Sequence, residues 1–151
     1  MSDLKNKVII VIDKEIMEKY KEIYFKMNPR CKKFPKYFEN PIPPSWNFFI
    51  AKIRMEQASI KAKYKDFAIW LAAKYGLAGL NLDKVIFTYD FYFNSNRARD
   101  IDNYGLTNKL LADGFVQAKV LTDDNSKHLA LRFNPFQLDR KNPRVEITVE
   151  Y

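Results

Sequence analysis

The chain has 151 residues, 47% of them hydrophobic and 29% charged, with a formal net charge of +8 and a sequence pI near 9.5. This length suits one domain, and the many aromatic residues with only four glycines exclude a disordered or low-complexity protein. The excess of Lys and Arg over Asp and Glu favours a polyanionic partner, although soluble proteins without such a partner can also be basic.

Cysteine content and the N-terminal segment bear on the compartment. Cys31 is the only cysteine, so no disulfide can form within the chain, and we interpret it as a buried or inert thiol. The apolar run over residues 8–12 is too short for a signal peptide or a membrane span. We therefore expect a cytoplasmic protein with no membrane partner.

The first half of the chain predicts one strand and two helices. Residues 8–12 are β-branched and predict a buried strand, and residues 14–27 have the apolar spacing of a short helix. Residues 28–44 hold most of the prolines and interleave basic with aromatic side chains, which suits either a nucleic-acid surface or rings packed onto the core. Ser45 is a good N-cap for one long helix that Gly76 would end.

The second half predicts most of a sheet. Residues 84–93 alternate between apolar and polar and indicate a long half-buried strand. A helix capped by Asp102 or Asn103 should run to about Val116. Two further strands are predicted, over residues 128–133 and 144–151. The fold class is therefore α+β, with a small mixed β-sheet and helices packed on one face.

Acidic residues gather within residues 97–125 of this otherwise basic chain. Asp100 and Asp102 stand at i and i+2, and Asp123 and Asp124 follow about twenty residues later. In an extended link the first two carboxylates share a side, and the turn before the next strand could return the second pair to the same sheet edge. Such a cluster suits a divalent cation that acts on a phosphodiester. Acidic pairs also occur in turns and at helix N-caps, and that alternative stays open.

Basic residues accompany the carboxylates. A helix that starts near Asp102 would place Lys109 and Asp113 on the same face as Asp102. Lys109 could hold the carboxylates in place or contact a phosphate, or it could be an ordinary surface lysine. Three further residues are candidates for phosphate contacts: Arg97, Arg99 and Lys127.

Other catalytic chemistries find little support. His128 is the only histidine, which rules out histidine-rich zinc sites and argues against a histidine general base. The sequence has no P-loop and no G-x-G-x-x-G or G-x-S-x-G motif, so we expect no nucleotide cofactor and no serine hydrolase activity.

The order of the acidic segment is specific. It consists of D-x-D-N over residues 100–103, then Lys109 and Asp113 on a helix, then Asp123-Asp124 before a strand. This pattern resembles the RusA-type Holliday junction resolvases, a family of RusA-like endodeoxyribonucleases found largely in phages and prophages. The segment P-P-S-W-N over residues 43–47 looks like the P-P-S-x-N segment of that family. The resemblance covers roughly residues 84–151, with a weaker match at 41–47.

Two features depart from the family pattern. The segment between Asn103 and Lys109 is three residues longer than in the shortest family members. This is nearly one helical turn, and it puts the approach of Lys109 to Asp102 in question. The stretch between the first strand and the P-P-S segment is long, so residues 13–44 are expected to be an insertion or loop region within a single RusA-like domain over residues 1–151.

The resemblance implies a homodimeric endonuclease that depends on Mg²⁺, or on Mn²⁺. Such an enzyme resolves four-way DNA junctions by paired symmetric nicks, in recombination and repair, in the cytoplasm of a bacterium or of a phage-infected host. It implies that Asp100, Asp102 and Asp124 are catalytic metal-binding carboxylates, that Asp123 assists them at the metal, and that Lys109 is the essential lysine. The alternatives are a branched-DNA-binding module without catalysis and a metal-dependent nuclease for flaps or other branched DNA.

Overall fold

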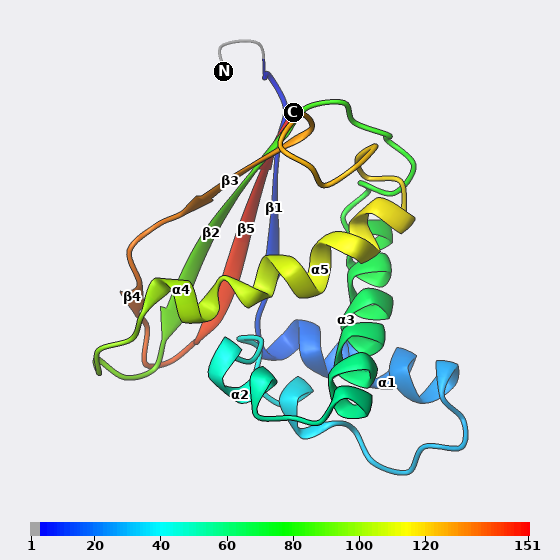
Figure 1. Ribbon diagram of the computed structural model, residues 1–151, viewed down its shortest axis with the longest axis vertical. Helices are drawn as coiled ribbons and strands as arrows, with labels where there is room; N and C mark the ends of the chain where they lie inside the picture. The colour runs from blue at the N-terminus through cyan, green and yellow to red at the C-terminus, as the bar shows by residue number, and fades with distance from the viewer. Residues whose placement is uncertain (1–3) are drawn as a thin grey trace.

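A computed structural model describes residues 4–151 of the chain (Figure 1). Its elements in chain order are β1 (Lys7–Ile12), α1 (Lys14–Met27), the 3₁₀ turn η1 (Lys36–Phe38), α2 (Trp46–Ile50), α3 (Arg54–Lys74), β2 (Val85–Phe93), α4 (Ile101–Tyr104), α5 (Leu106–Gln117), β3 (Leu129–Phe133), β4 (Gln137–Leu138) and β5 (Arg144–Glu150). Within the described range, no helix has the length and apolarity needed to cross a membrane.

The sheet is mixed, with strand order β1-β5-β2-β3 and β4 continuing beside the end of β2. Strand β5 is antiparallel to both β1 and β2, whereas β3 and β4 are parallel to β2. Helix α5 crosses one face of this sheet and α3 packs against α5 (Figure 1). The predicted mixture of helices with a small mixed sheet is therefore confirmed.

Alternation along the central strands decides which side chains enter the core. The odd-numbered residues of β2 and of β5 are buried, and the even-numbered residues from Thr88 and Glu146 onward are partly exposed. This is the pattern predicted for residues 84–93 and 144–151. Strand β1 differs from its prediction as a buried strand, because it lies at the edge of the sheet and Ile9 is 42% exposed.

The single long helix predicted after Ser45 is wrong, because the structure has two helices there. Helix α2 ends at Ile50, and Ile53 is extended at φ −67° and ψ 161° before α3 begins. The side chain of Gln57 stabilises this break, since its Nε2 donates to the carbonyl oxygens of Phe49 and Lys52 at 3.2 and 3.1 Å. Gly76 follows α3 with a φ of 70°, as expected for a glycine that ends a helix.

Residues 13–44 are built into the hydrophobic core. The ring of Tyr20 on α1 lies 4.7 Å from that of Phe67, and Phe38 lies 4.7 Å from Tyr64, measured between centroids. Phe38 is fully buried, so this ring packs down on the core as one of the two sequence interpretations required. Cys31 is exposed in the loop after α1, so the first half of its interpretation as a buried or inert thiol is wrong, and an inert thiol stays a prediction.

Helices α3 and α5 approach closely at Gly114. A β-carbon at this position would lie 2.5 Å from the carbonyl oxygen of Lys65 and 2.6 Å from the β-carbon of Ala68. At its other end α5 is anchored to the sheet, because the hydroxyl of Tyr89 donates to Asn108 Oδ1 at 2.7 Å. These two contacts fix α5, and α5 in turn positions the short helix α4 that directly precedes it.

Candidate metal and nucleic-acid site

A hollow of about 560 Å³ lies where α2 meets α4. It joins two segments that are distant in sequence, and its lining residues are Trp46, Asn47, Arg99, Asp100, Ile101, Asp102 and Asn103. The Oδ1 of Asn103 accepts a hydrogen bond of 3.0 Å from the backbone N–H of Asn47, 56 residues away. Ser45 Oγ accepts from the N–H of Phe48 at 3.3 Å. Two orphan N–H groups in the first turn of α2 are thus satisfied, one of them by α4.

This bond corrects the capping prediction for the acidic segment. Neither Asp102 nor Asn103 caps its own helix, since the N-cap residue of α4 is Asp100, which makes no side-chain capping bond. Asn103 caps α2 instead. The physical reason is that α4 starts two or three residues earlier than expected, which places Asn103 inside the helix with its side chain toward α2.

Asp100 and Asp102 share this hollow and are both exposed. Asp100 is extended at φ −86° and ψ 129°, while Asp102 lies in the first turn of α4, so the two do not sit on one extended link as predicted. Within residues 4–151, neither carboxylate forms an ion pair or accepts a side-chain hydrogen bond. Two carboxylates facing solvent are therefore available to a ligand.

Arg99 is held firmly beside these carboxylates. Its Nη1 donates to the backbone oxygens of Ser95 and Arg97 at 3.1 Å, and its Nη2 donates to Ser95 Oγ at 2.8 Å. The guanidinium carbon lies 4.0 Å from the centroid of the Phe93 ring. The cation is therefore fixed at the rim of the hollow by contacts that leave its charge uncompensated by an acid in the described chain.

A basic cleft of about 820 Å³ adjoins the hollow, and Arg99 lines both. One part of its lining comes from the Pro-rich loop (residues 28–44), and another comes from the end of β2 with the segment after it and from residues 141–143 before β5. Five basic residues line it: Lys14, Lys36, Arg97, Arg99 and Lys141. Glu39 is the acidic residue among the lining side chains. This excess of positive charge suits a phosphodiester backbone.

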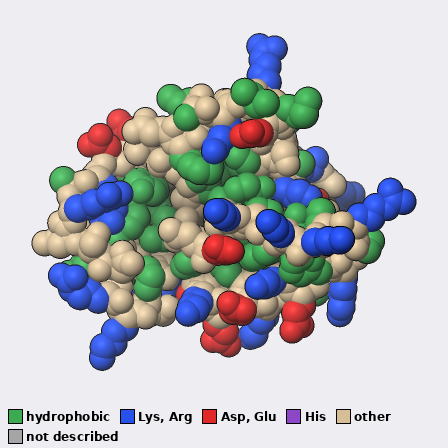
Figure 2. All heavy atoms as spheres, turned by 90° about the horizontal axis from the view of Figure 1, so that it is seen from below, with side chains coloured by type: hydrophobic (Ala, Val, Ile, Leu, Met, Phe, Trp, Pro, Cys, Tyr) green, Lys and Arg blue, Asp and Glu red, His purple; other side chains and the backbone are tan. Residues whose placement is uncertain are grey.

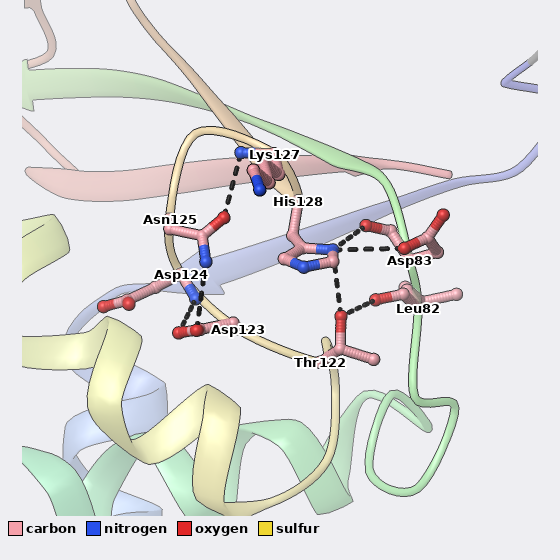
Figure 3. Close-up of polar contacts among 8 residues, drawn as sticks. All are labelled: Leu82, Asp83, Thr122, Asp123, Asp124, Asn125, Lys127 and His128. Atoms are coloured by element: carbon pink, nitrogen blue, oxygen red, sulfur yellow. Dashed lines mark hydrogen bonds and ion pairs between the residues drawn. The ribbon is translucent and has the colours of Figure 1, made fainter.

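The second acidic pair lies elsewhere. The oxygens of Asp123 accept from the backbone N–H of Asp124 at 2.7 Å and from Asn125 Nδ2 at 3.0 Å, so Asp123 braces its own loop (Figure 3). The carboxylate of Asp124 is exposed and points away from that loop (Figure 3). Close by, His128 Nδ1 lies 2.8 Å from the backbone oxygen of Asp83, a contact that ties the loop to the start of β2.

The predicted meeting of the four carboxylates at one sheet edge is wrong within a single chain. Leu129, which follows the Asp123–Asp124 loop, pairs with Val85 at the start of β2, whereas Asp100 follows the end of β2. A parallel crossover leaves from one end of a strand and returns to the other, and nine residues of strand span about 30 Å. Across residues 4–151, no three acidic, cysteine or histidine side chains are grouped closely enough to hold a metal ion.

The remaining predicted residues lie outside the hollow. Lys109 and Asp113 are exposed on α5, and they form no ion pair with each other although they are four residues apart. Lys127 is exposed in the loop before β3, at the opposite end of the sheet from Arg97. Its backbone N–H donates to Asn125 Oδ1 at 3.0 Å.

The structure adds residues that the sequence did not single out. Lys14 and Lys141 reach the cleft from opposite ends of the chain. Asn47 belongs to the P-P-S-W-N segment and enters the site through its backbone N–H. The P-P-S-W-N segment was the one sequence signal that pointed to this part of the site.

Comparison with known protein families and with curated proteins finds no match to this chain.

Proposed function

We propose that the protein is a magnesium-dependent, structure-specific endodeoxyribonuclease of the RusA type that resolves four-way DNA junctions by paired nicks. One observation carries the proposal. The two segments that resemble the family, residues 43–47 and 100–103, meet in one hollow through the bond between Asn103 and Asn47. The basic cleft beside this hollow supplies a path for the DNA strand.

The chemistry of the hollow fits a magnesium ion. Mg²⁺ commonly binds through one or two carboxylates, several waters and the phosphate of its substrate, and Asp100 and Asp102 are two unpaired carboxylates in one hollow. When bound, the metal polarises a phosphate and supplies a hydroxide nucleophile at neutral pH. Arg99 is already fixed at the rim, so it can bind a phosphate oxygen with little further loss of side-chain entropy.

The homodimer in this proposal would account for the position of Asp123 and Asp124. Within one chain the two acidic pairs lie at opposite ends of β2. A two-fold axis can place the start of β2 in one copy beside the end of β2 in the other. The Asp124 loop of a second copy would then complete the hollow of the first. Lys109 would then lie between the two pairs, on the exposed face of α5. Paired nicks also need two active sites at a fixed separation.

The decisive assay incubates the protein with a synthetic four-way junction, a flap and a linear duplex, with and without Mg²⁺. We expect symmetric nicks in the junction only when Mg²⁺ is present. Asp102→Asn should abolish nicking while it preserves or tightens junction binding, because it removes a hard anionic ligand and also a charge that repels phosphate. Asp100→Asn and Asp124→Asn should behave alike, and Glu18→Gln on α1 serves as the control for a lost exposed carboxylate.

The same assay tests the alternatives. A second candidate is a branched-DNA-binding protein without catalysis, because the basic lining of the cleft would bind a DNA backbone whether or not a metal acts on it. That candidate requires a stable junction complex and no nicks at any metal concentration. Preferred cleavage of the flap would indicate a nuclease for other branched DNA. Normal nicking by all three Asn variants would refute the assignment of these carboxylates.

A further inference from the structure

A second pocket continues from the basic cleft toward α3, and nothing in the proposed reaction uses it. It measures about 590 Å³ and lies between the Pro-rich loop, α2 and the start of α3. Four residues line both this pocket and the cleft: Lys36, Asn40, Ile42 and Pro44. Because Arg99 in turn lines both the cleft and the acidic hollow, the cleft lies between the candidate metal site and this pocket.

The pocket has an aromatic and apolar lining. The ring of Tyr37 is fixed by packing, since its centroid lies 5.0 Å from Phe38 and 5.6 Å from Tyr64. Phe48 lines another side and is 39% exposed, and Ile42 and Ile60 contribute buried aliphatic surface. An exposed phenylalanine beside a hollow of this size has apolar surface that a planar ligand would cover.

Charge surrounds this apolar lining. The ammonium group of Lys52 lies 4.6 Å from the centroid of the Phe48 ring, and Lys36 lines both the pocket and the cleft. The face seen from below carries many lysines and arginines around and between apolar side chains (Figure 2). A ligand that suits both features is apolar and planar in its body and anionic at its edge.

Polar groups in the pocket match the edges of a nucleobase. Asn40 Oδ1 already accepts from the N–H of Ile42 at 3.0 Å, so the two Nδ2 hydrogens remain as donors. The hydroxyl of Tyr37 is protonated at neutral pH, as for any tyrosine, and can also donate; burial raises its pKa further, to about 12. Glu56 lines the same pocket and can accept from the exocyclic amino group that cytosine, adenine and guanine carry and thymine lacks.

We propose that this pocket binds one unpaired nucleobase of a DNA strand whose backbone follows the basic cleft. The lysines at its rim would contact the flanking phosphates, and Phe48 would stack on the base. A paired duplex has to open a base pair to supply such a base, whereas a single-stranded segment of a branched substrate supplies it directly. The inference rests on the proposed function only in taking DNA as the ligand, and its test needs no cleavage.

The test measures binding by fluorescence anisotropy in EDTA, with a labelled dodecamer of deoxycytidine and a dodecamer of the same length that carries abasic sites. The wild-type protein should bind the deoxycytidine strand at least about 5-fold more tightly than the abasic strand, since stacking of one base is worth this much or more. Phe48→Ala should remove this preference and leave abasic binding unchanged. Phe48→Trp should keep it, and Leu131→Ala, which removes a side chain of similar exposure on β3, should not alter it.

Several results would overturn the proposal. Equal affinity of the wild-type protein for both strands would show that the backbone alone is bound. An equal loss on both strands in Phe48→Ala would assign Phe48 a structural role. A changed mass of Phe48→Ala by light scattering, with base preference intact, would assign the face to a second copy of the chain. The base preference is measured in EDTA, so it should persist even if the protein cleaves no DNA, and Asp102→Asn should retain it. The proposed nuclease activity and the proposed base pocket can therefore be refuted separately.

Discussion

Gly114 is the position at which the packing of α5 on α3 can be tested most directly. In Gly114→Ala the new β-carbon would lie 2.5 Å from the carbonyl oxygen of Lys65, well short of an ordinary van der Waals contact of 3.4 Å or more. Both obstacles are parts of a helix, so α5 must shift away from α3 by close to 1 Å. Overpacking of this kind costs about 1–3 kcal/mol, and alanine returns about 1 kcal/mol of helix propensity.

The clash with backbone cannot be relieved by a side-chain rotation, so the overpacking cost should lie in the upper part of this range, at about 2–3 kcal/mol. After the gain in helix propensity, we expect Gly114→Ala to lose about 1–2 kcal/mol of unfolding free energy. For a chain of this size, that is a fall of about 3–8 °C in Tm. Thermal and urea unfolding followed by circular dichroism measure both quantities. Gly105→Ala is the control, because Gly105 has a helical φ of −61° and its β-carbon would meet only the Asp102 oxygen at 3.3 Å. A Gly114→Ala variant at least as stable as the wild-type protein would refute this account of the α3–α5 contact.

Three further predictions concern the site and its surroundings. Asn103→Ala should lower the unfolding free energy by about 0.5–1 kcal/mol through loss of the cap on α2, and Asn103→Asp, which keeps an acceptor, should restore it in the same urea titration. Replacing Arg97 and Arg99 by Ala should weaken junction binding and reduce the slope of log K against log salt by about 2, measured by gel shift at several salt concentrations; an unchanged slope would remove both from the interface. Arg144 donates to Asp139 at 2.8 Å and lowers the pKa of that carboxyl. The pair therefore stabilises the fold fully at pH values above the pKa that Asp139 has in the unfolded chain, and this stabilisation is lost as the pH falls through the lower pKa of the folded state. Asp139→Asn should accordingly flatten the fall in Tm below about pH 4, and an unchanged acid profile would contradict this.

Local patterning predicted the parts of the fold that depend on neighbouring residues. The alternation in β2 and β5 specified their buried faces, because a strand has a side-chain period of two whatever lies beside it. The break between α2 and α3 was missed because the helical spacing of apolar residues continues through it and the linker over residues 51–53 holds neither glycine nor proline. That break depends on Gln57, whose role becomes visible only in three dimensions.

The candidate site divides in the same way. The spacing of Asp100 and Asp102 predicted that they would share one site, and the structure brings them into one hollow, although through the start of a helix. The contact of Asn103 with Asn47 joins residues far apart in sequence, and no local rule predicts it. Asp123 and Asp124 lie at the other end of the sheet because β3 runs parallel to β2, and the sequence alone does not specify whether two strands are parallel or antiparallel.

The bond between Asn47 and Asn103 also gives the acidic hollow a time-dependent behaviour. It joins two very short helices, and such pieces open by local fluctuation more readily than the strands beneath them. When α4 lifts from α2, the N–H of Asn47 loses its acceptor and becomes open to exchange with solvent. Its exchange rate therefore reports how often the two acidic side chains leave their places beside α2. The N–H of Phe48 is bound by Ser45 of the same helix end, so its exchange reports fraying of α2 itself. Comparing the exchange rates of the Asn47 and Phe48 amides therefore distinguishes movement of α4 from fraying of α2.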